Sequence, residues 1–180
     1  LRDAFDEIVV GATVRELVDG GWLAPIDVIA PPTRLAGIAA DPCEAWARVA
    51  GGRPTVAFAR TIAESEALAR GLSERGIQAR HVDGGTSTRE RDAALALFAA
   101  GRVQVLCNVF VLTEGWDAPR AEVCLMARGC GSASMFLQCI GRVRRMTPGK
   151  RALLIDLAGV VHEHGHPDED REYTLDGVGR

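Results

Sequence analysis

The chain has 180 residues, of which 47% are hydrophobic and 25% charged, a composition typical of a folded globular protein and unlike that of a disordered one. Its net charge of −3 excludes a general polyanion binder, so contact with nucleic acid would require a local basic patch. No apolar run approaches the roughly 20 residues that cross a bilayer, and the charged start is unlike a secretory signal. Because the first residue is Leu1 and not Met, we expect a fragment or a processed product.

The predicted elements begin with a helix that opens at the capping box Thr13–Glu16, followed by a short strand over 27–30 that stops at a proline pair. Asp41 and Pro42 then have the order typical of an N-cap and a first helical residue, so a second helix begins there. Beyond this point, apolar runs alternate with helical patterns. The predicted strands cover 55–59, 77–82, 103–107, 122–126 and 152–157, and the helices cover 61–72, 87–101 and 134–145.

This alternation predicts an α/β fold in three layers, with a mostly parallel sheet and helices on both faces. In such a sheet, ligands bind at loops that follow the carboxyl ends of the strands. The five cysteines include no Cys-x-x-Cys pair, which indicates buried free thiols in a reducing compartment. Trp22 and Trp46 have apolar neighbours at helical spacing and are predicted to lie in the core.

One segment combines polar residues at a spacing suited to phosphate. Gln138, Arg142 and Arg145 are four and three residues apart, so a helix continuing to Arg145 would present all three on one face. Arginine offers a permanently charged fork that matches phosphate oxygens, which favours a bound polyphosphate. The alternative is a solvated basic helix end stabilised by the helix dipole.

A second polar segment follows the strand predicted over 103–107. In Thr113-Glu114-Gly115-Trp116-Asp117, a glycine can let the backbone approach a ligand while the carboxylate accepts a hydroxyl group. Taken alone, this segment favours a plain turn that half-buries Trp116.

Together the two segments resemble motifs VI and V of the C-terminal motor domain of superfamily 2 helicases and translocases. Q-x-x-G-R-x-x-R follows T-E-G-x-D in the family's order, the stretch 55–61 matches motif IV, and 81–86 is similar to the adjoining nucleic-acid-binding segment. The resemblance covers about residues 40 to 165. It is to bacterial and phage DEAD/DEAH-type DNA helicases and restriction-type translocases, and it implies a RecA-like fold.

The resemblance also implies roles for particular residues. Arg142 and Arg145 would act as arginine fingers toward ATP, and Gln138 would orient that face or its water. Gly115, Asp117 and Gly141 would lie on the ATP side, with Asp117 at the ribose. The residues expected to contact the phosphate backbone of one strand are Arg60, Thr61, Gly84, Thr86 and Thr113. Thr61 has a second reading, in which it only caps its helix.

The chain contains neither a G-x-x-x-x-G-K-[ST] phosphate loop nor a D-E-x-[DH] acid pair. In the family both belong to the first motor domain, so we expect that domain to hold most of the ATP and its Mg²⁺ and to be a partner, fused or separate. The predicted division is a helix and linker over 1–40, the motor domain over 41–165 and a surface tail over 166–180. The predicted location is the cytoplasm of a bacterium or a phage-infected host.

Two alternatives accompany this reading. The chain could be a non-catalytic RecA-like module that binds nucleic acid or a partner protein, although such a binder would not need a pair of finger arginines. The alternating imidazoles His162, His164 and His166, with acids at 168–170, could bind a metal. Similar stretches end relatives of this family without a metal, so we predict no metal site. DNA is the expected nucleic acid, with RNA as the alternative.

Overall fold

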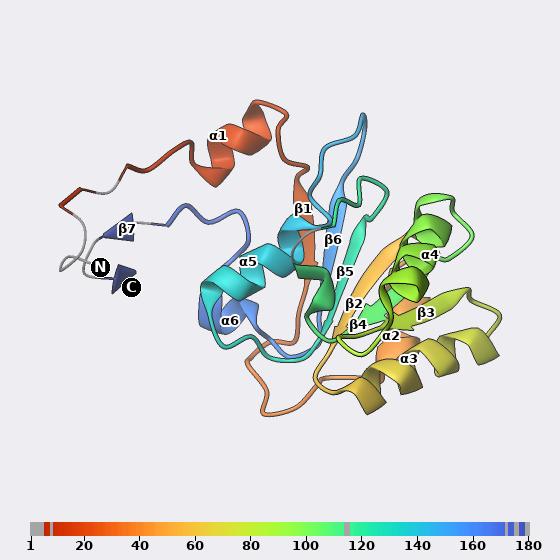
Figure 1. Cartoon of the computed structure of the whole chain (residues 1–180). Coiled ribbons are helices and arrows are strands. Elements are labelled where there is room, and N and C mark those ends of the chain that lie inside the picture. Colours follow the sequence, from red (N-terminus) through yellow and green to blue (C-terminus); the bar gives the residue numbers. More distant parts are fainter. Residues whose placement is uncertain (1–5, 8, 114–115, 172, 175–176, 179–180) are drawn as a thin grey trace.

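The computed structural model describes residues 6–7, 9–113, 116–171, 173–174 and 177–178. Six parallel strands form one sheet in the order β1-β6-β5-β2-β4-β3 (Figure 1). Their bounds are β1 Ile26–Ile29, β2 Thr55–Ala59, β3 Ala79–Val82, β4 Val105–Asn108, β5 Val123–Ala127 and β6 Ala152–Asp156. The predicted parallel sheet is therefore confirmed, and each predicted apolar run overlaps a strand.

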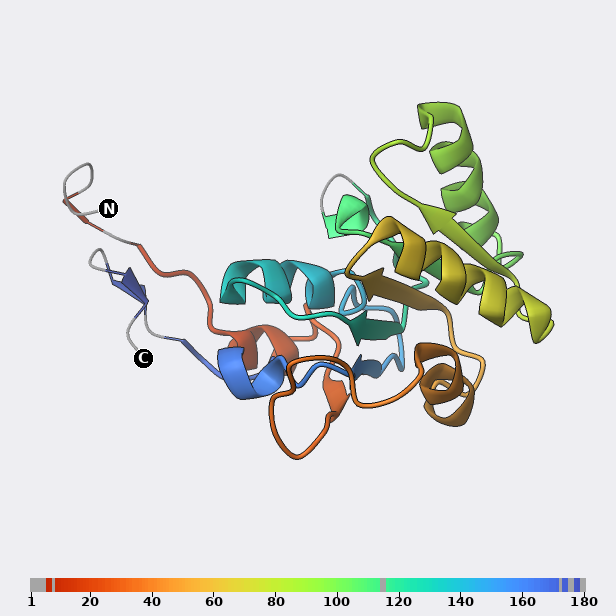
Figure 2. The same cartoon turned by 90° about the horizontal axis from the view of Figure 1, so that it is seen from below.

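Helices cover both faces of the sheet, which makes the three layers (Figure 2). The helices are α1 Val14–Asp19, α2 Pro42–Val49, α3 Ile62–Glu74, α4 Thr88–Ala99, the 3₁₀ turn η1 Val111–Thr113, α5 Ala133–Gly141 and α6 Val161–His164. α2 and α3 pack on one face, while α4 and α5 pack on the other. A strand between two helical layers must be apolar on both sides, so Val56 and Phe58 of β2 enter one core cluster and Ala57 enters the other.

Helix starts follow the predicted capping chemistry. The Asp41 carboxylate accepts a hydrogen bond from the Glu44 amide at 2.9 Å, with Pro42 in the first turn. Capping boxes are complete at Thr13, Thr61 and Ser87. The five cysteines are buried and unpaired, as predicted.

The end of α5 differs from the prediction. The helix stops at Gly141 with Arg142 as its C-cap, so Arg142 and Arg145 do not continue one helical face as far as residue 145. The cause is tertiary: the chain turns to pair with the segment before β1, where Leu23 and Arg145 form an antiparallel bridge and the Ala24 amide donates to the Arg144 carbonyl at 2.9 Å.

The two tryptophans separate in the structure. Trp46 is buried and its indole N–H donates to the Thr55 hydroxyl at 2.6 Å. Trp22 is 75% exposed, so the prediction that it lies in the core is wrong. Trp22 lies between α1 and the start of β1, in a tight turn where its amide bonds to the carbonyl of Leu17 and its ring lies against Gly20.

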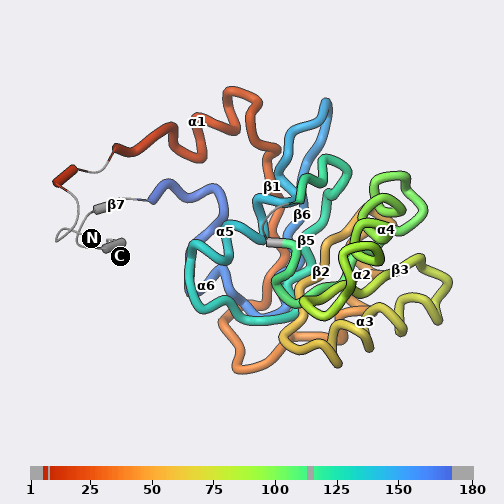
Figure 3. Tube along the Cα trace, in the orientation of Figure 1, coloured from red at the N-terminus to blue at the C-terminus, as the bar shows by residue number. Residues whose placement is uncertain are grey.

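The segments outside residues 41–165 take part in the packing. β1 pairs with β6, and Pro167 is buried. α1 lies beside the β1 end of the strand order (Figure 3), while β7 Tyr173–Thr174 and β8 Gly177–Val178 form a separate antiparallel pair. The division at residues 40 and 165 stays a prediction. Within the described part of the chain, no helix has the length and apolar character needed to cross a membrane.

Candidate functional site

Two groups of predicted site residues lie at different ends of the sheet. The first group follows the carboxyl ends of β2, β3 and β4 and comprises Arg60, Thr61, Gly84, Thr86 and Thr113, whereas Asp117 and Arg145 lie in loops that precede β5 and β6. We call the first group the strand-end group and the second the arginine group, to which Gln138, Gly141 and Arg142 of the α5 end also belong. Gly115 lies outside the described residues, and Thr113 ends the η1 turn.

α5 supplies the base of the arginine group. The Ser132 hydroxyl caps the helix at the Met135 amide, at 3.2 Å, and Phe136, Cys139 and Ile140 bury the opposite face. Gln138 is therefore left exposed. Gly141 is the last helical residue, and a side chain there would meet no atom within 4 Å. α5 thus presents Gln138 to solvent and ends where the two arginines begin.

Both arginines contact the segment around Asp117. Arg142 donates to the Trp116 carbonyl, and the Trp116 ring packs edge-on against Phe98 with centroids 5.8 Å apart. Arg145 forms an ion pair with Asp117 at 3.4 Å, and the two side chains are 53% and 63% exposed. An ion pair so exposed contributes about 0–1 kcal/mol, so a ligand phosphate could replace the carboxylate at little cost.

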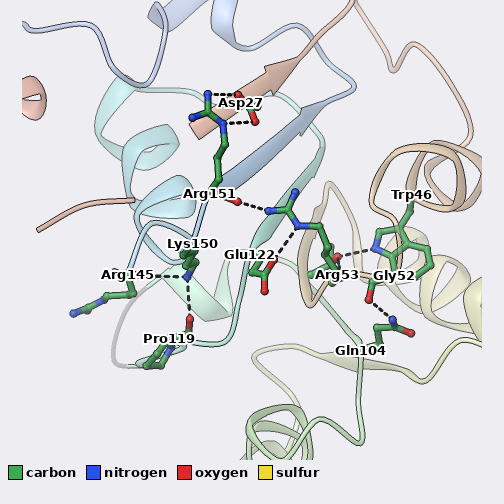
Figure 4. Close-up of polar contacts among 11 residues, drawn as sticks. Asp27, Trp46, Gly52, Arg53, Gln104, Pro119, Glu122, Arg145, Lys150 and Arg151 are labelled. Carbon is green, nitrogen blue, oxygen red and sulfur yellow. Dashed lines mark hydrogen bonds and ion pairs between the residues drawn. The ribbon is translucent and has the colours of Figure 1, made fainter. Parts of the chain in front are cut away.

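A buried lysine positions this loop pair, and sequence reasoning missed it. The Lys150 ammonium donates to the carbonyls of Pro119 at 2.9 Å and Arg145 at 2.8 Å (Figure 4). It thereby joins the loop before β5 to the residue that pairs with Asp117. Burial lowers the pKa of Lys150 to about 8. The available signal was that Lys150 is the single lysine of a chain whose other basic residues are all arginine.

Lys150 makes stability depend on pH. Its pKa is about 8 in the folded chain against an ordinary 10.5, so between these values the unfolded chain binds more protons and the free energy of unfolding rises with pH. A Lys150→Met variant lacks this titration. We expect the free energy of unfolding of the wild type to rise relative to that of the variant between pH 8 and 10.5, by at most about 3 kcal/mol. Urea unfolding of both proteins across this range measures it, and a difference that stays constant contradicts the prediction.

Arg144 belongs to the core and not to the exposed arginine group. Its guanidinium donates to the carbonyls of Ala24 at 3.0 Å and Pro167 at 3.2 Å, and it pairs with Asp168 at 2.5 Å. Arg144 therefore does not project into solvent beside Arg142 and Arg145. The same backbone turn that ends α5 directs it inward.

In the strand-end group, several polar groups are already engaged. The Thr61 hydroxyl accepts from the Glu64 amide at 3.1 Å, so its capping role is confirmed, and Arg60 pairs with Glu64 at 2.8 Å. The Thr86 hydroxyl donates to Asp83 at 2.9 Å, a hydrogen bond that holds the pKa of that carboxyl below its usual range. Gly84 is exposed at the tip of this loop. Phosphate contact by these residues stays a prediction.

The histidine stretch is occupied by protein contacts. His162 bonds to the Pro31 carbonyl at 2.7 Å and His164 to the Cys130 carbonyl at 2.8 Å. Across the described ranges, no three or more His, Cys, Asp or Glu side chains come together as a metal-binding cluster.

The six parallel strands form a RecA-like sheet, and α5 and the turn after it carry Gln138, Arg142 and Arg145. Residues 41–147 match the protein family described as Helicase conserved C-terminal domain. The chain belongs to this family.

Relatives and solved structures agree with this assignment. The chain is 30% identical over 193 residues to the 51.5 kDa protein of a Lactococcus phage, covering 96% of this chain and 43% of that protein. It is 32% identical over 108 residues to the ATP-dependent helicase IRC3 of Saccharomyces cerevisiae, covering 59% and 16%. A fragment of an HsdR subunit of a type I restriction enzyme from Vibrio vulnificus superposes with a TM-score of 0.69 at 21% identity, covering 87% and 36%. The chain thus spans less than half the length of either relative.

Proposed function

We propose that this chain is the second motor domain of an ATP-dependent helicase or translocase that acts on DNA, in a bacterial or phage-infected cytoplasm. Membership of the helicase C-terminal family and relatives named as ATP-dependent helicases support the motor assignment. The resemblance to phage and bacterial DNA helicases supports DNA, with RNA as the alternative. A first motor domain, fused or separate, is the proposed partner.

One observation carries the proposal: Arg142 and Arg145 meet the Trp116–Asp117 segment, and the Arg145–Asp117 pair is open to solvent. Exposed cation and carboxylate side by side fit the phosphates and the ribose of ATP. We assign phosphate contact to Arg145 and Arg142 and ribose contact to Asp117. Gln138 is assigned to orient water, and Gly115 and Gly141 are assigned to the ATP side of the site. ATP with Mg²⁺, when bound, supplies the phosphoryl transfer that drives such motors.

The proposed work of the two arginines is electrostatic. A guanidinium placed before negative charge develops stabilises the transferring group without reorganisation. Lys150 keeps the Arg145 backbone in place by bonding its carbonyl, which makes Lys150 a positioning residue. The strand-end group, comprising Arg60, Thr61, Gly84, Thr86 and Thr113, is assigned to the phosphate backbone of one strand.

The proposal is tested by comparing this chain with the complete motor. The purified 180-residue chain is expected to release no phosphate from ATP above background, because it lacks the phosphate-loop lysine and the paired acids. Joined to its first motor domain, it is expected to support hydrolysis stimulated by single-stranded DNA. Turnover by the isolated chain that is lost in its own Arg145→Ala variant would contradict the division of labour. A complete protein that binds DNA without hydrolysis would favour the non-catalytic module.

A further inference from the structure

Arg128 lies beside Arg60 at the end of the sheet where the parallel strands have their carboxyl ends. β2 and β5 are neighbours, and their last residues, Ala59 and Ala127, are partners in the register. The two arginines follow these partners directly, so both enter the same space. They line one cavity of about 330 Å³. None of the four motif segments recognised in the sequence includes Arg128.

The Arg128 side chain is held in one orientation. Its guanidinium lies over the Phe110 ring, 3.6 Å from the centroid, and donates to the carbonyls of Gly129 at 3.0 Å and Ala59 at 3.4 Å. Phe110 has a φ of 55°, a left-handed conformation that is uncommon for a bulky residue. Strain of this kind persists where the surroundings enforce it, and it is found preferentially at functional sites.

The charge of Arg128 is not matched by a carboxylate. Arg60 pairs with Glu64 at 2.8 Å, but no carboxylate oxygen of the described residues lies within 4 Å of the Arg128 guanidinium. Burial lowers the pKa of Arg128, so its positive charge is held at a cost. A fixed, partly desolvated guanidinium without a counterion provides a site for an anion such as a phosphate.

Apart from Asp41 and Glu64, the side chains that line the rest of the cavity are apolar. Its walls come from the loop before α2, from the start of α2 and from α3, and they include Ala36, Ile38, Pro42, Cys43, Ala67 and Leu68. The loop is fixed to the end of β6, since Leu35 and Ala39 donate to the carbonyls of Ala158 and Leu157 at 3.2 and 2.8 Å. A cation at the mouth of an apolar hollow matches the two parts of a nucleotide, a charged phosphate and a flat apolar base.

We propose that this cavity, the Arg128 pocket, binds one unstacked nucleotide of the strand, with its phosphate on Arg128 and its base between Ile38 and Ala67. The inference rests on the proposed function, because the strand-end group brings the strand to this edge. Asp41 and Glu64 at the rim offset part of the positive charge, so phosphate alone binds weakly and the base contributes the remainder. The pocket would thus bind one base of the strand without distinguishing which base it is.

The test compares two short single-stranded DNAs with the same backbone, one carrying 2-aminopurine bases and one abasic, bound to the 180-residue chain at low salt. Low salt is needed because a chain of net charge −3 has few backbone contacts. We expect the strand with bases to bind about tenfold more tightly, since stacking of one base contributes about 1–3 kcal/mol. Ala67→Leu, which fills the pocket, should remove this difference and leave abasic binding unchanged. Arg128→Ala should weaken both strands.

Ile38→Ser removes an apolar side chain from the pocket lining and should also reduce the base-dependent difference. Arg102→Ala, at an exposed residue of the α4–β4 loop, is the matched charge control for Arg128→Ala. If Ala67→Leu and Ile38→Ser both fold and keep the full tenfold difference, the pocket does not hold a base and the inference falls, with the motor assignment intact. If the wild-type chain binds neither strand, the assignment of the strand to this edge falls together with the pocket.

Discussion

Replacing Arg145 or Arg142 with alanine in the complete motor is expected to abolish most nucleic-acid-stimulated ATP hydrolysis while leaving ATP binding nearly intact. The base and most phosphate contacts are assigned to the first domain, whereas the arginines act on charge that develops during transfer. Interactions made chiefly in the transition state change the rate and not the affinity. Arginine fingers contribute roughly 10³–10⁵ in rate, and lysine should restore little because it lacks the planar fork.

Hydrolysis rates and nucleotide affinities of the alanine variants decide this prediction. Arg144 cannot serve as the control, because it is buried and holds three carbonyl or carboxylate partners. Arg102→Ala is the appropriate control, since this exposed arginine lies in the loop before β4 and is not a member of the arginine group. Equal small losses for Arg142, Arg145 and Arg102 would return the cluster to a solvated basic surface. Because Arg142 also bonds to the Trp116 carbonyl, its variant needs an unfolding measurement as well.

The largest effect on stability is expected from Arg144→Ala. Removing the guanidinium leaves the carbonyls of Ala24 and Pro167 and the Asp168 carboxylate without their donor. Breaking a buried pair in this way costs about 3–5 kcal/mol, and because the Asp168 side chain is 35% exposed we expect a smaller loss, about 2–3 kcal/mol. Urea denaturation of the chain measures the loss.

Arg151→Ala provides the comparison for Arg144. Arg151 makes two bonds of 2.7 Å to Asp27, yet both side chains are more than half exposed. An exposed pair contributes at most about 1 kcal/mol. If the two variants lose the same small amount, the burial of Arg144 carries no energetic weight and our account of the α5 end is incorrect.

Much of the fold could be predicted because its determinants are local. The Thr61 and Ser87 capping boxes begin the helices at the expected residues, and apolar runs mark the strands to within a few positions. The end of α5 could not be predicted in this way. Gly141 is a weak stop signal, since the helical pattern continues toward Pro148, and the helix stops there because the chain pairs with residues 23–24, a contact that no local pattern encodes.

The candidate site was also predicted only in part, and the residues that were missed are those whose contacts are distant along the chain. Motif spacing brought Asp117, Arg142 and Arg145 together correctly as neighbours, although their functional roles stay proposals. Lys150 and Arg128 were missed because their partners are distant along the chain: Lys150 bonds to Pro119, 31 residues away, and Arg128 to Ala59, 69 residues away. Such side chains are found only when the register of the sheet is known.

The position of β6 has a consequence for how the protein folds. β6 lies between β5 and β1, and β1 pairs with no other strand of the main sheet. β1 therefore has no partner in this sheet until β6 has been made, and β6 must enter between β1, made much earlier, and β5, the strand directly before it. Such non-local pairing slows folding, and the open edge of β5 is meanwhile available to other chains. The nascent protein is thus most prone to aggregation just before β6 is synthesised, and chaperones would be needed most at that stage.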